Sequence, residues 1–236
     1  MKILIDPGHR NNINDFGATG NGQKESVLAL TVSKKLQDAL KDYNVDTYLS
    51  RASEDETISI DARYRKAREV GADLLMSIHI NSAANSSASG IEVLYKEQQL
   101  LATHLTNALC AATGAKNRGA KHRTDLGVLN GFSNSVLLEL GFISNTEECE
   151  KLVSTEYQNK LVDAIVKVLA DTYKFVAVKE DTALKEAVNK IIDSGININA
   201  TSWNKIENIN LKNVPALINK LGGIDKLAEK KIISSP

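Results

Sequence analysis

The sequence predicts an α/β fold in which a largely parallel sheet is covered by helices on both faces. Apolar runs of strand length alternate along the chain with longer segments whose apolar residues recur every three or four positions. Strands that alternate with helices of this length pair in parallel and are joined by right-handed crossovers. The chain has 236 residues, 42% of them hydrophobic, which leaves room for one such domain and a small appendage.

The first half of the predicted domain begins with the apolar run Ile3 to Ile5, a short strand that an Asp-Pro-Gly turn ends at once. Residues 11–22 form a loop rich in Asn and Gly, longer than most strand-to-helix connections. A helix follows over 25–43, where apolar residues lie four positions apart. The pattern then predicts a strand at 45–49 and a helix at 58–70.

The second half adds three strands and two helices. Residues 74–81 form an apolar run that contains a histidine near its end and leads into a loop of Ala, Ser and Asn. The remaining strands are 91–95 and 136–142, and the remaining helices are 98–112 and 157–173.

A change in composition near residue 176 divides the chain. Residues 179–236 contain no His, Cys or Arg and are rich in Asn. We therefore predict a domain of 1–175, a linker of 176–182 and a small, mainly helical domain of 183–236.

The overall composition excludes several classes of partner. Lys plus Arg equals Asp plus Glu at 29 each, which argues against a surface for nucleic acid or acidic lipid. Because no apolar run reaches the roughly 18 residues of a membrane helix, we expect no membrane insertion. Cys110 and Cys149 lack the spacing of a zinc or disulfide site and are interpreted as ordinary thiols.

Two histidines suggest a metal site. His9 and His79 both lie at the ends of predicted strands, at the sheet edge where α/β proteins bind ligands. A catalytic zinc takes three protein ligands and leaves one position for water. Glu25, which opens the helix after the Gly-rich loop, is the best-placed third ligand. By contrast, we assign His104 and His122 to ordinary helix and surface positions.

Glu139 interrupts the apolar run 136–142. An unpaired carboxylate buried there would cost several kcal/mol, so Glu139 either faces water at the sheet edge or has a charged partner. A metal-bound water at the mouth of the site would meet this need and would make Glu139 a general base. We also predict that Asn81 and Arg63 bind substrate. For Arg63, a solvated helix face and a role in ordering the site stay open.

Four blocks of this sequence together resemble the type 3 family of zinc-dependent N-acetylmuramoyl-L-alanine amidases. They are Asp6-Pro7-Gly8-His9, then Glu25, then Ser77 to Ala83, then Glu139 to Asn145. The resemblance covers about residues 1–175. It implies a mixed, mostly parallel six-stranded sheet with helices on both faces.

The resemblance also implies the chemistry. His9, Glu25 and His79 would bind Zn²⁺, and Glu139 would be the catalytic carboxylate. The zinc-activated water would cleave the amide between N-acetylmuramic acid and the L-alanine of the peptidoglycan stem, so the partner would be the peptidoglycan of a bacterial cell wall.

Two further features indicate a phage or prophage endolysin, with a host autolysin that lacks its leader as the alternative. Only residues 82–89 separate the His79 strand from the next strand, too few for the inhibitory helix of regulated family members. The sequence also starts directly on its first strand, so we expect synthesis in the cytoplasm without a signal peptide. The enzyme would act on the wall after release, with the help of a holin if it comes from a phage. Residues 183–236 would target the wall or form a homo-oligomer.

Two other functions stay open from the residues alone. A zinc carboxypeptidase-type peptidase could use the same His, Glu and His ligands. A non-catalytic wall-binding module is disfavoured, because a structural zinc normally has a fourth protein ligand and Glu139 would then have no task.

Overall fold

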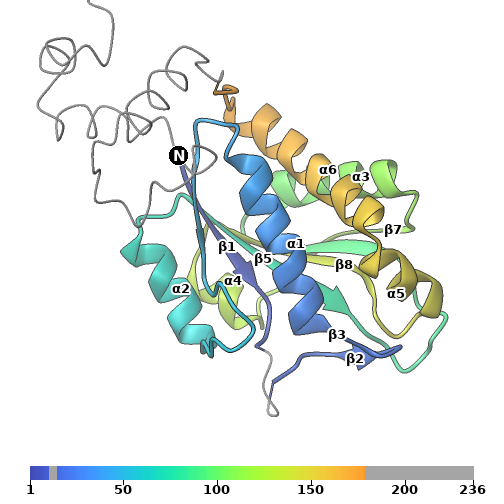
Figure 1. The fold of residues 1–236 in the computed structure, drawn as a ribbon. Coiled ribbons are helices and arrows are strands. Elements are labelled where there is room, and N and C mark those ends of the chain that lie inside the picture. The colour runs from blue at the N-terminus through green and yellow to red at the C-terminus, as the bar shows by residue number, and fades with distance from the viewer. Residues whose placement is uncertain (11–14, 179–236) are drawn as a thin grey trace, which may run out of the picture. The chain divides into compact units, whose positions relative to one another are not determined.

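A six-stranded sheet lies at the centre of residues 1–10 and 15–178, the part of the chain that the computed structural model describes (Figure 1). Its spatial order is β4-β1-β5-β8-β6-β7, and every neighbouring pair is parallel except the antiparallel β6 and β8. The mixed, mostly parallel six-stranded sheet is therefore confirmed. The strands are β1 (Lys2–Pro7), β4 (Asp46–Leu49), β5 (Leu74–Asn81), β6 (Ile91–Tyr95), β7 (Asn117–His122) and β8 (Ser135–Phe142).

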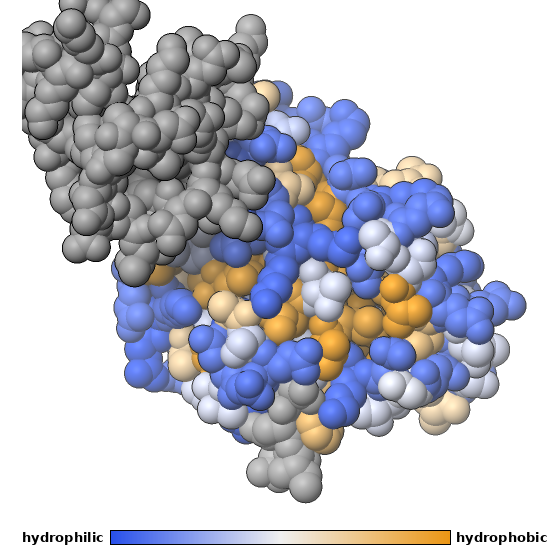
Figure 2. Space-filling model, viewed as in Figure 1, coloured by the Kyte–Doolittle hydropathy of each residue, from blue (hydrophilic) through white to orange (hydrophobic). Residues whose placement is uncertain are grey.

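Helices cover both faces of the sheet, as predicted. The larger apolar cluster lies between the sheet and α1, α3, α5 and α6, and the smaller lies between the sheet and α2 and α4 (Figure 1). Figure 2 views the face over α1 and α6, where hydrophilic residues surround smaller hydrophobic areas. The helices are α1 (Glu25–Leu40), α2 (Ile60–Glu69), α3 (Gln99–Thr113), α4 (Gly127–Gly131), α5 (Thr146–Val153) and α6 (Thr155–Tyr173).

Five elements are absent from the sequence prediction. Strand β7 is polar and mostly half-exposed at the sheet edge, so it has no apolar run. The predicted loop 11–22 is partly wrong, because β2 (Thr19–Gly20) and β3 (Gln23–Lys24) form a small hairpin. Its Asn-Gly turn has positive φ at both residues, which two-residue hairpins favour. Helices α4 and α5 are too short to show a clear apolar period.

The compact unit that carries the sheet runs from Met1 to Ala177. The predicted C-terminal domain, 183–236, lies outside the described residues. None of the described helices is long and apolar enough to cross a membrane.

The topology brings several strand ends to one edge. The carboxyl ends of β1, β5 and β8 lie side by side there, because these three strands are parallel neighbours. Strand β6 runs the other way, so its first residues reach the same edge. Residues that follow three strands and begin a fourth therefore meet in one place.

Glu148 on α5 connects two strand ends at this edge of the sheet. Its side-chain oxygens accept hydrogen bonds from the backbone N–H of Gly90 at 2.7 Å and of Phe142 at 2.7 Å. The residue is 8% exposed, so water cannot replace these bonds. One carboxylate thus holds the start of β6 and the end of β8.

We predict that Glu148→Gln lowers the free energy of unfolding by about 1–3 kcal/mol, the cost of a buried donor without an acceptor. A glutamine amide offers one acceptor oxygen and turns its NH₂ group toward the other backbone N–H. Glu150→Gln, on the exposed side of α5, is the matched control. Chemical denaturation measures both, and equal stability of the two variants would contradict this role of Glu148.

Candidate metal centre and active site

His9 occupies a tight turn directly after β1. Its φ is 54°, in the left-handed region that non-glycine residues rarely adopt. The backbone N–H of Gly8 donates to the carbonyl of Ile78 at 2.8 Å and ties the turn to β5. On the imidazole, Nδ1 lies 2.7 Å from Oδ1 of Asp15, which fixes the direction of the ring.

Glu25 begins α1 and connects the two histidines. Its Oε2 lies 3.3 Å from Nε2 of His9, and its Oε1 lies 2.9 Å from Nδ1 of His79. Each oxygen also accepts a backbone N–H, from Ala18 at 2.8 Å and from Ile80 at 3.1 Å. The carboxylate is only 4% exposed and is held in place from both sides.

Three side chains thus form the cluster that the sequence predicts. One ligand atom from each of His9, Glu25 and His79 lies within 4.8 Å of the others. The two rings meet edge to face, with centroids 4.9 Å apart. A tetrahedral zinc with bonds of about 2.0–2.1 Å would hold its donor atoms about 3.3 Å apart, close to the separation of His9 Nε2 and Glu25 Oε2.

The charges in this cluster suit a cation. Burial alone would raise the pKa of Glu25, but the hydrogen bonds and charges of His79 and His9 hold it far below its ordinary value. Burial lowers the pKa of His9, yet Glu25 and Asp15 together raise it above its ordinary value. The group therefore favours added positive charge, which a metal ion would supply.

Two glycines leave room for the cluster. A Cβ at Gly8 would lie 2.5 Å from the His79 ring. A Cβ at Gly17 would lie 2.5 Å from Oε2 of Glu25 and 2.6 Å from the His9 ring. Only glycine allows the backbone to approach the three side chains so closely, and the residues present therefore fit a bound metal.

Glu139 lies beside the cluster. On β8 it is the register partner of His79 on β5, so the two residues are neighbours at the sheet edge. Its Oε2 atom is buried and has no hydrogen-bond partner among residues 1–10 and 15–178. Burial, followed by the charges of Glu25 and Glu92, raises the pKa of Glu139 well above its ordinary value. A carboxyl group of this kind is suited to exchange a proton with a ligand.

Arg63 is buried behind the His9 turn and is 4% exposed. Its guanidinium donates to Oδ1 of Asp6 and to the carbonyl of Pro7, both at 2.6 Å, and to the carbonyl of His9 at 2.7 Å. These contacts support the role in ordering the site, and they argue against the solvated helix face. Contact of Arg63 with substrate stays a prediction.

Arg51 is a second positioning residue, which the sequence analysis missed. It is 1% exposed and donates to the carbonyls of Gly8 at 3.0 Å and Ser26 at 2.7 Å. It thereby joins the His9 turn to the first turn of α1, where Glu25 lies. An arginine that follows a strand directly is the one signal in the sequence, and it is weak.

The other predicted residues lie farther along the edge. Asn81 donates from Nδ2 to Oε1 of Glu92 at 3.3 Å, and its Oδ1 accepts the N–H of Ser82. Its predicted substrate contact stays a prediction. His104 on α3 and His122 at the end of β7 are not part of the cluster.

Comparisons with known proteins identify the family. Residues 3–171 match the type 3 amidase family, N-acetylmuramoyl-L-alanine amidase. The chain therefore belongs to this family, and the enzyme class predicted from the sequence is confirmed.

Individual relatives agree with the family assignment. The chain is 36% identical over 177 residues to the protein YqiI of Bacillus subtilis, across 72% of this chain and 84% of YqiI. It is 34% identical over 169 residues to the N-acetylmuramoyl-L-alanine amidase LytC of the same organism, across 69% of this chain and 34% of LytC. The match therefore spans about a third of the length of LytC.

Solved structures share the fold. N-acetylmuramoyl-L-alanine amidase AmiC2 of Nostoc punctiforme superposes with a TM-score of 0.69 at 30% identity, over 74% of this chain and 97% of AmiC2. An N-acetylmuramoyl-L-alanine amidase of Clostridium difficile gives 0.69 at 28% identity, over 73% and 96%.

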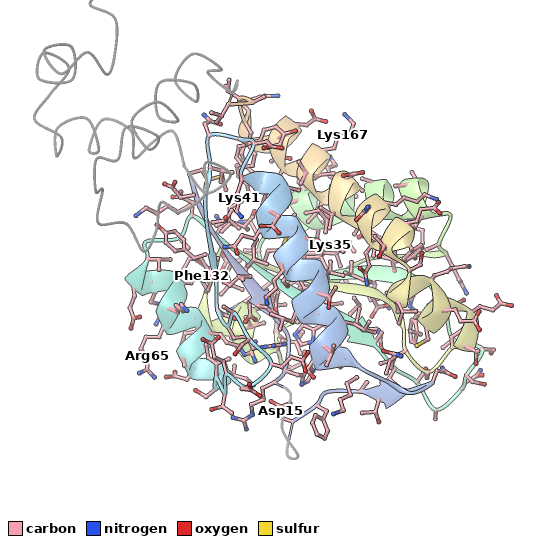
Figure 3. The ribbon with its side chains drawn as sticks, in the orientation of Figure 1. Asp15, Lys35, Lys41, Arg65, Phe132 and Lys167 are labelled. Atoms are coloured by element: carbon pink, nitrogen blue, oxygen red, sulfur yellow. The ribbon has the colours of Figure 1, made fainter. Side chains whose placement is uncertain are left out.

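We predict that Arg63→Lys lowers the free energy of unfolding by about 2–3 kcal/mol, because an ammonium cannot reproduce the planar fork that serves Asp6, Pro7 and His9. Arg65→Lys is the matched control on the same helix, since Arg65 lies on the outer side of α2 (Figure 3), where its side chain is 61% exposed and pairs with Asp61. We expect it to change stability by less than about 0.5 kcal/mol. If denaturation curves of the two variants coincide, Arg63 does not hold the turn.

Proposed function

We propose that this enzyme hydrolyses the amide bond between the lactyl group of N-acetylmuramic acid and the L-alanine of the peptidoglycan stem, with zinc bound by His9, Glu25 and His79. The observation that carries the proposal is the buried Oε2 of Glu139, which has no hydrogen-bond partner within the described part of the chain and lies next to a three-ligand cluster. The family match over residues 3–171 supports the same reaction. It does not favour a carboxypeptidase or a non-catalytic wall-binding module.

Each residue has a separate task. A zinc ion at the cluster would supply an activated water and polarise the scissile carbonyl. With Nδ1–H donating to Asp15, His9 would present Nε2 to a metal. Glu25 keeps its negative charge because its pKa is low.

Glu139 would move the proton. As a base, Glu139 would accept the proton of the attacking water on Oε2. It would then deliver that proton to the leaving alanine nitrogen. Its raised pKa helps the second step, because a weakly acidic carboxyl retains the proton until the nitrogen requires it. The register pairing of His79 on β5 with Glu139 on β8 supports this role.

Three earlier predictions concern matters that the described residues do not test. These are the phage or prophage endolysin origin with holin-assisted release, the host autolysin alternative, and wall targeting or oligomerisation by 183–236. All three stay predictions.

We predict that the purified protein holds about one zinc and releases new L-alanine amino termini from cell walls, and that Glu139→Gln retains the zinc but loses activity about 10²- to 10⁴-fold. Glutamine keeps the size of the side chain but cannot accept the proton. His79→Ala is expected to lose zinc and activity together. Metal analysis and amino-terminal labelling of digested walls measure both properties.

Two results would contradict this assignment. A Glu139→Gln enzyme that digests walls at the normal rate would leave the reaction without its base. Wall digestion by the wild-type enzyme without new L-alanine amino termini would mean that another bond is cut.

We also predict that Gly17→Ala weakens zinc binding, whereas Gly22→Ala does not. Both glycines have similar positive φ, 69° and 74°, so both substitutions cost about 1–2 kcal/mol of backbone strain. Only at Gly17 does the new Cβ meet Glu25 and His9, whereas nothing lies within 4 Å of it at Gly22. Competition with a chromophoric chelator measures zinc affinity, and equal affinities would show that close packing at Gly17 does not shape the site.

A further inference from the structure

A second group of charged side chains continues from Glu139 across the sheet. Glu92 lies on β6, and Arg118 and Lys121 lie on β7. Arg118 Nε donates to Oε2 of Glu92 at 2.7 Å, and Lys121 Nζ donates to the same oxygen at 2.6 Å. We call these three residues the β6–β7 cluster.

The register places this cluster next to the proposed base. Glu92 is the direct partner of Glu139 across the antiparallel pair of β6 and β8. Directly opposed residues of such a pair have side chains on the same face. Since neighbouring strands lie about 4.8 Å apart, the cluster begins about one strand spacing beyond Glu139 and about two beyond His79.

The cluster carries excess positive charge. Burial alone would raise the pKa of Glu92, but the hydrogen bonds and charges of Lys121 and Arg118 lower it below its ordinary value. Glu92 is therefore an anion that faces two cations. One positive charge is left over, and it lies one strand away from the buried Oε2 of Glu139, which has no hydrogen-bond partner among the described residues.

The two cations are held in place but remain accessible. The Arg118 guanidinium lies over the Phe142 ring, 4.8 Å from its centroid, and its side chain is 27% exposed. The Lys121 side chain is 41% exposed. Within the described part of the chain its ammonium donates only to Glu92, so two of its three N–H donors are available to a ligand.

We propose that the β6–β7 cluster binds a carboxylate of the stem peptide close to the scissile amide. This proposal rests on the proposed function. In that substrate the carboxyl of muramic acid is consumed in the amide, so the nearest free carboxylates belong to the peptide. A stem peptide that runs from Glu139 across β6 toward β7 would bring these carboxylates to Lys121 and Arg118.

Asn81 belongs to the same network. It follows His79 by two residues on β5, and its amide donates to the second oxygen of Glu92. Glu92 is thus fixed by three donors, and its Oε2 holds Arg118 and Lys121 next to each other. We therefore expect Asn81 to contribute to substrate binding by supporting Glu92 in this carboxylate subsite.

The test uses two small substrates in which the glutamate γ-carboxyl is blocked as an amide: N-acetylmuramoyl-L-alanyl-D-glutamate γ-amide, and its counterpart with the α-carboxylate also replaced by a carboxamide. We expect the wild-type enzyme to prefer the acid by about tenfold or more in kcat/KM, mainly through KM, as one charge-assisted hydrogen bond implies. Lys121→Gln should remove most of this preference. Lys121→Arg, which keeps the charge, should restore it.

Lys116→Gln is the matched control, because Lys116 is exposed directly before β7 and carries the same charge. It should retain the preference of the wild-type enzyme. Equal rates on the two peptides, or an unchanged preference in Lys121→Gln, would overturn the subsite alone. No hydrolysis of either peptide by the wild-type enzyme would contradict the proposed function and the subsite with it.

A phosphate of a wall polymer is the other source of an anion. Cell walls with and without their phosphate polymers therefore form a second arm of the experiment. If Lys121→Gln affects only the phosphate-bearing walls and leaves the small peptides unaffected, the ligand is a phosphate and the stem-peptide assignment is overturned.

Discussion

The site depends on the contacts that the Glu25 carboxylate makes with two imidazoles and two backbone N–H groups. Each of its two oxygens accepts one backbone N–H and faces one imidazole, so it joins the loop before α1 to the end of β5. Hydrogen bonds to a charged acceptor are stronger than neutral ones, and here they are buried. The contacts of its two oxygens with the imidazoles keep His9 and His79 on either side of the position where a cation would lie. The pairing of β1 with β5 brings the two histidines to one edge, and this carboxylate is the group that contacts both rings.

Other buried charges at this edge hold backbone turns and so support the cluster. Arg63 and Arg51 donate to carbonyls of the turn that carries His9, and Glu148 accepts from the backbone at the ends of β6 and β8. Arg63 also forms an ion pair with Asp6, whereas Arg51 and Glu148 are satisfied by hydrogen bonds to the backbone, which offset part of the cost of burial. Glu139 differs, because its Oε2 has no partner within the described residues. In this site the metal-binding side chains are held in place, and the carboxyl of Glu139 is left to contact a bound substrate. Proton transfer requires such an arrangement.

Much of the site could be predicted from sequence because it depends on strand ends. His9, Glu25 and His79 follow apolar runs or turn signals, and parallel strands place such residues at a common edge. The missed features lack such signals. Strand β7 has no apolar run, and the place of Arg51 just after β4 is only a weak signal, because its contact with Ser26 depends on the three-dimensional path of the chain. The Glu92 contacts depend on an antiparallel strand within a mostly parallel sheet, which local pattern cannot reveal.

The most direct test of this account is a crystal structure of the zinc-loaded protein with anomalous diffraction data collected at the zinc edge. The account predicts one strong peak bounded by His9, Glu25 and His79, with ligand distances of about 2.0–2.2 Å and with Glu139 beside the metal but not bound to it. A peak at any other group of side chains would contradict the account. So would an empty cluster in which Glu25 still bonds directly to both imidazoles at saturating zinc.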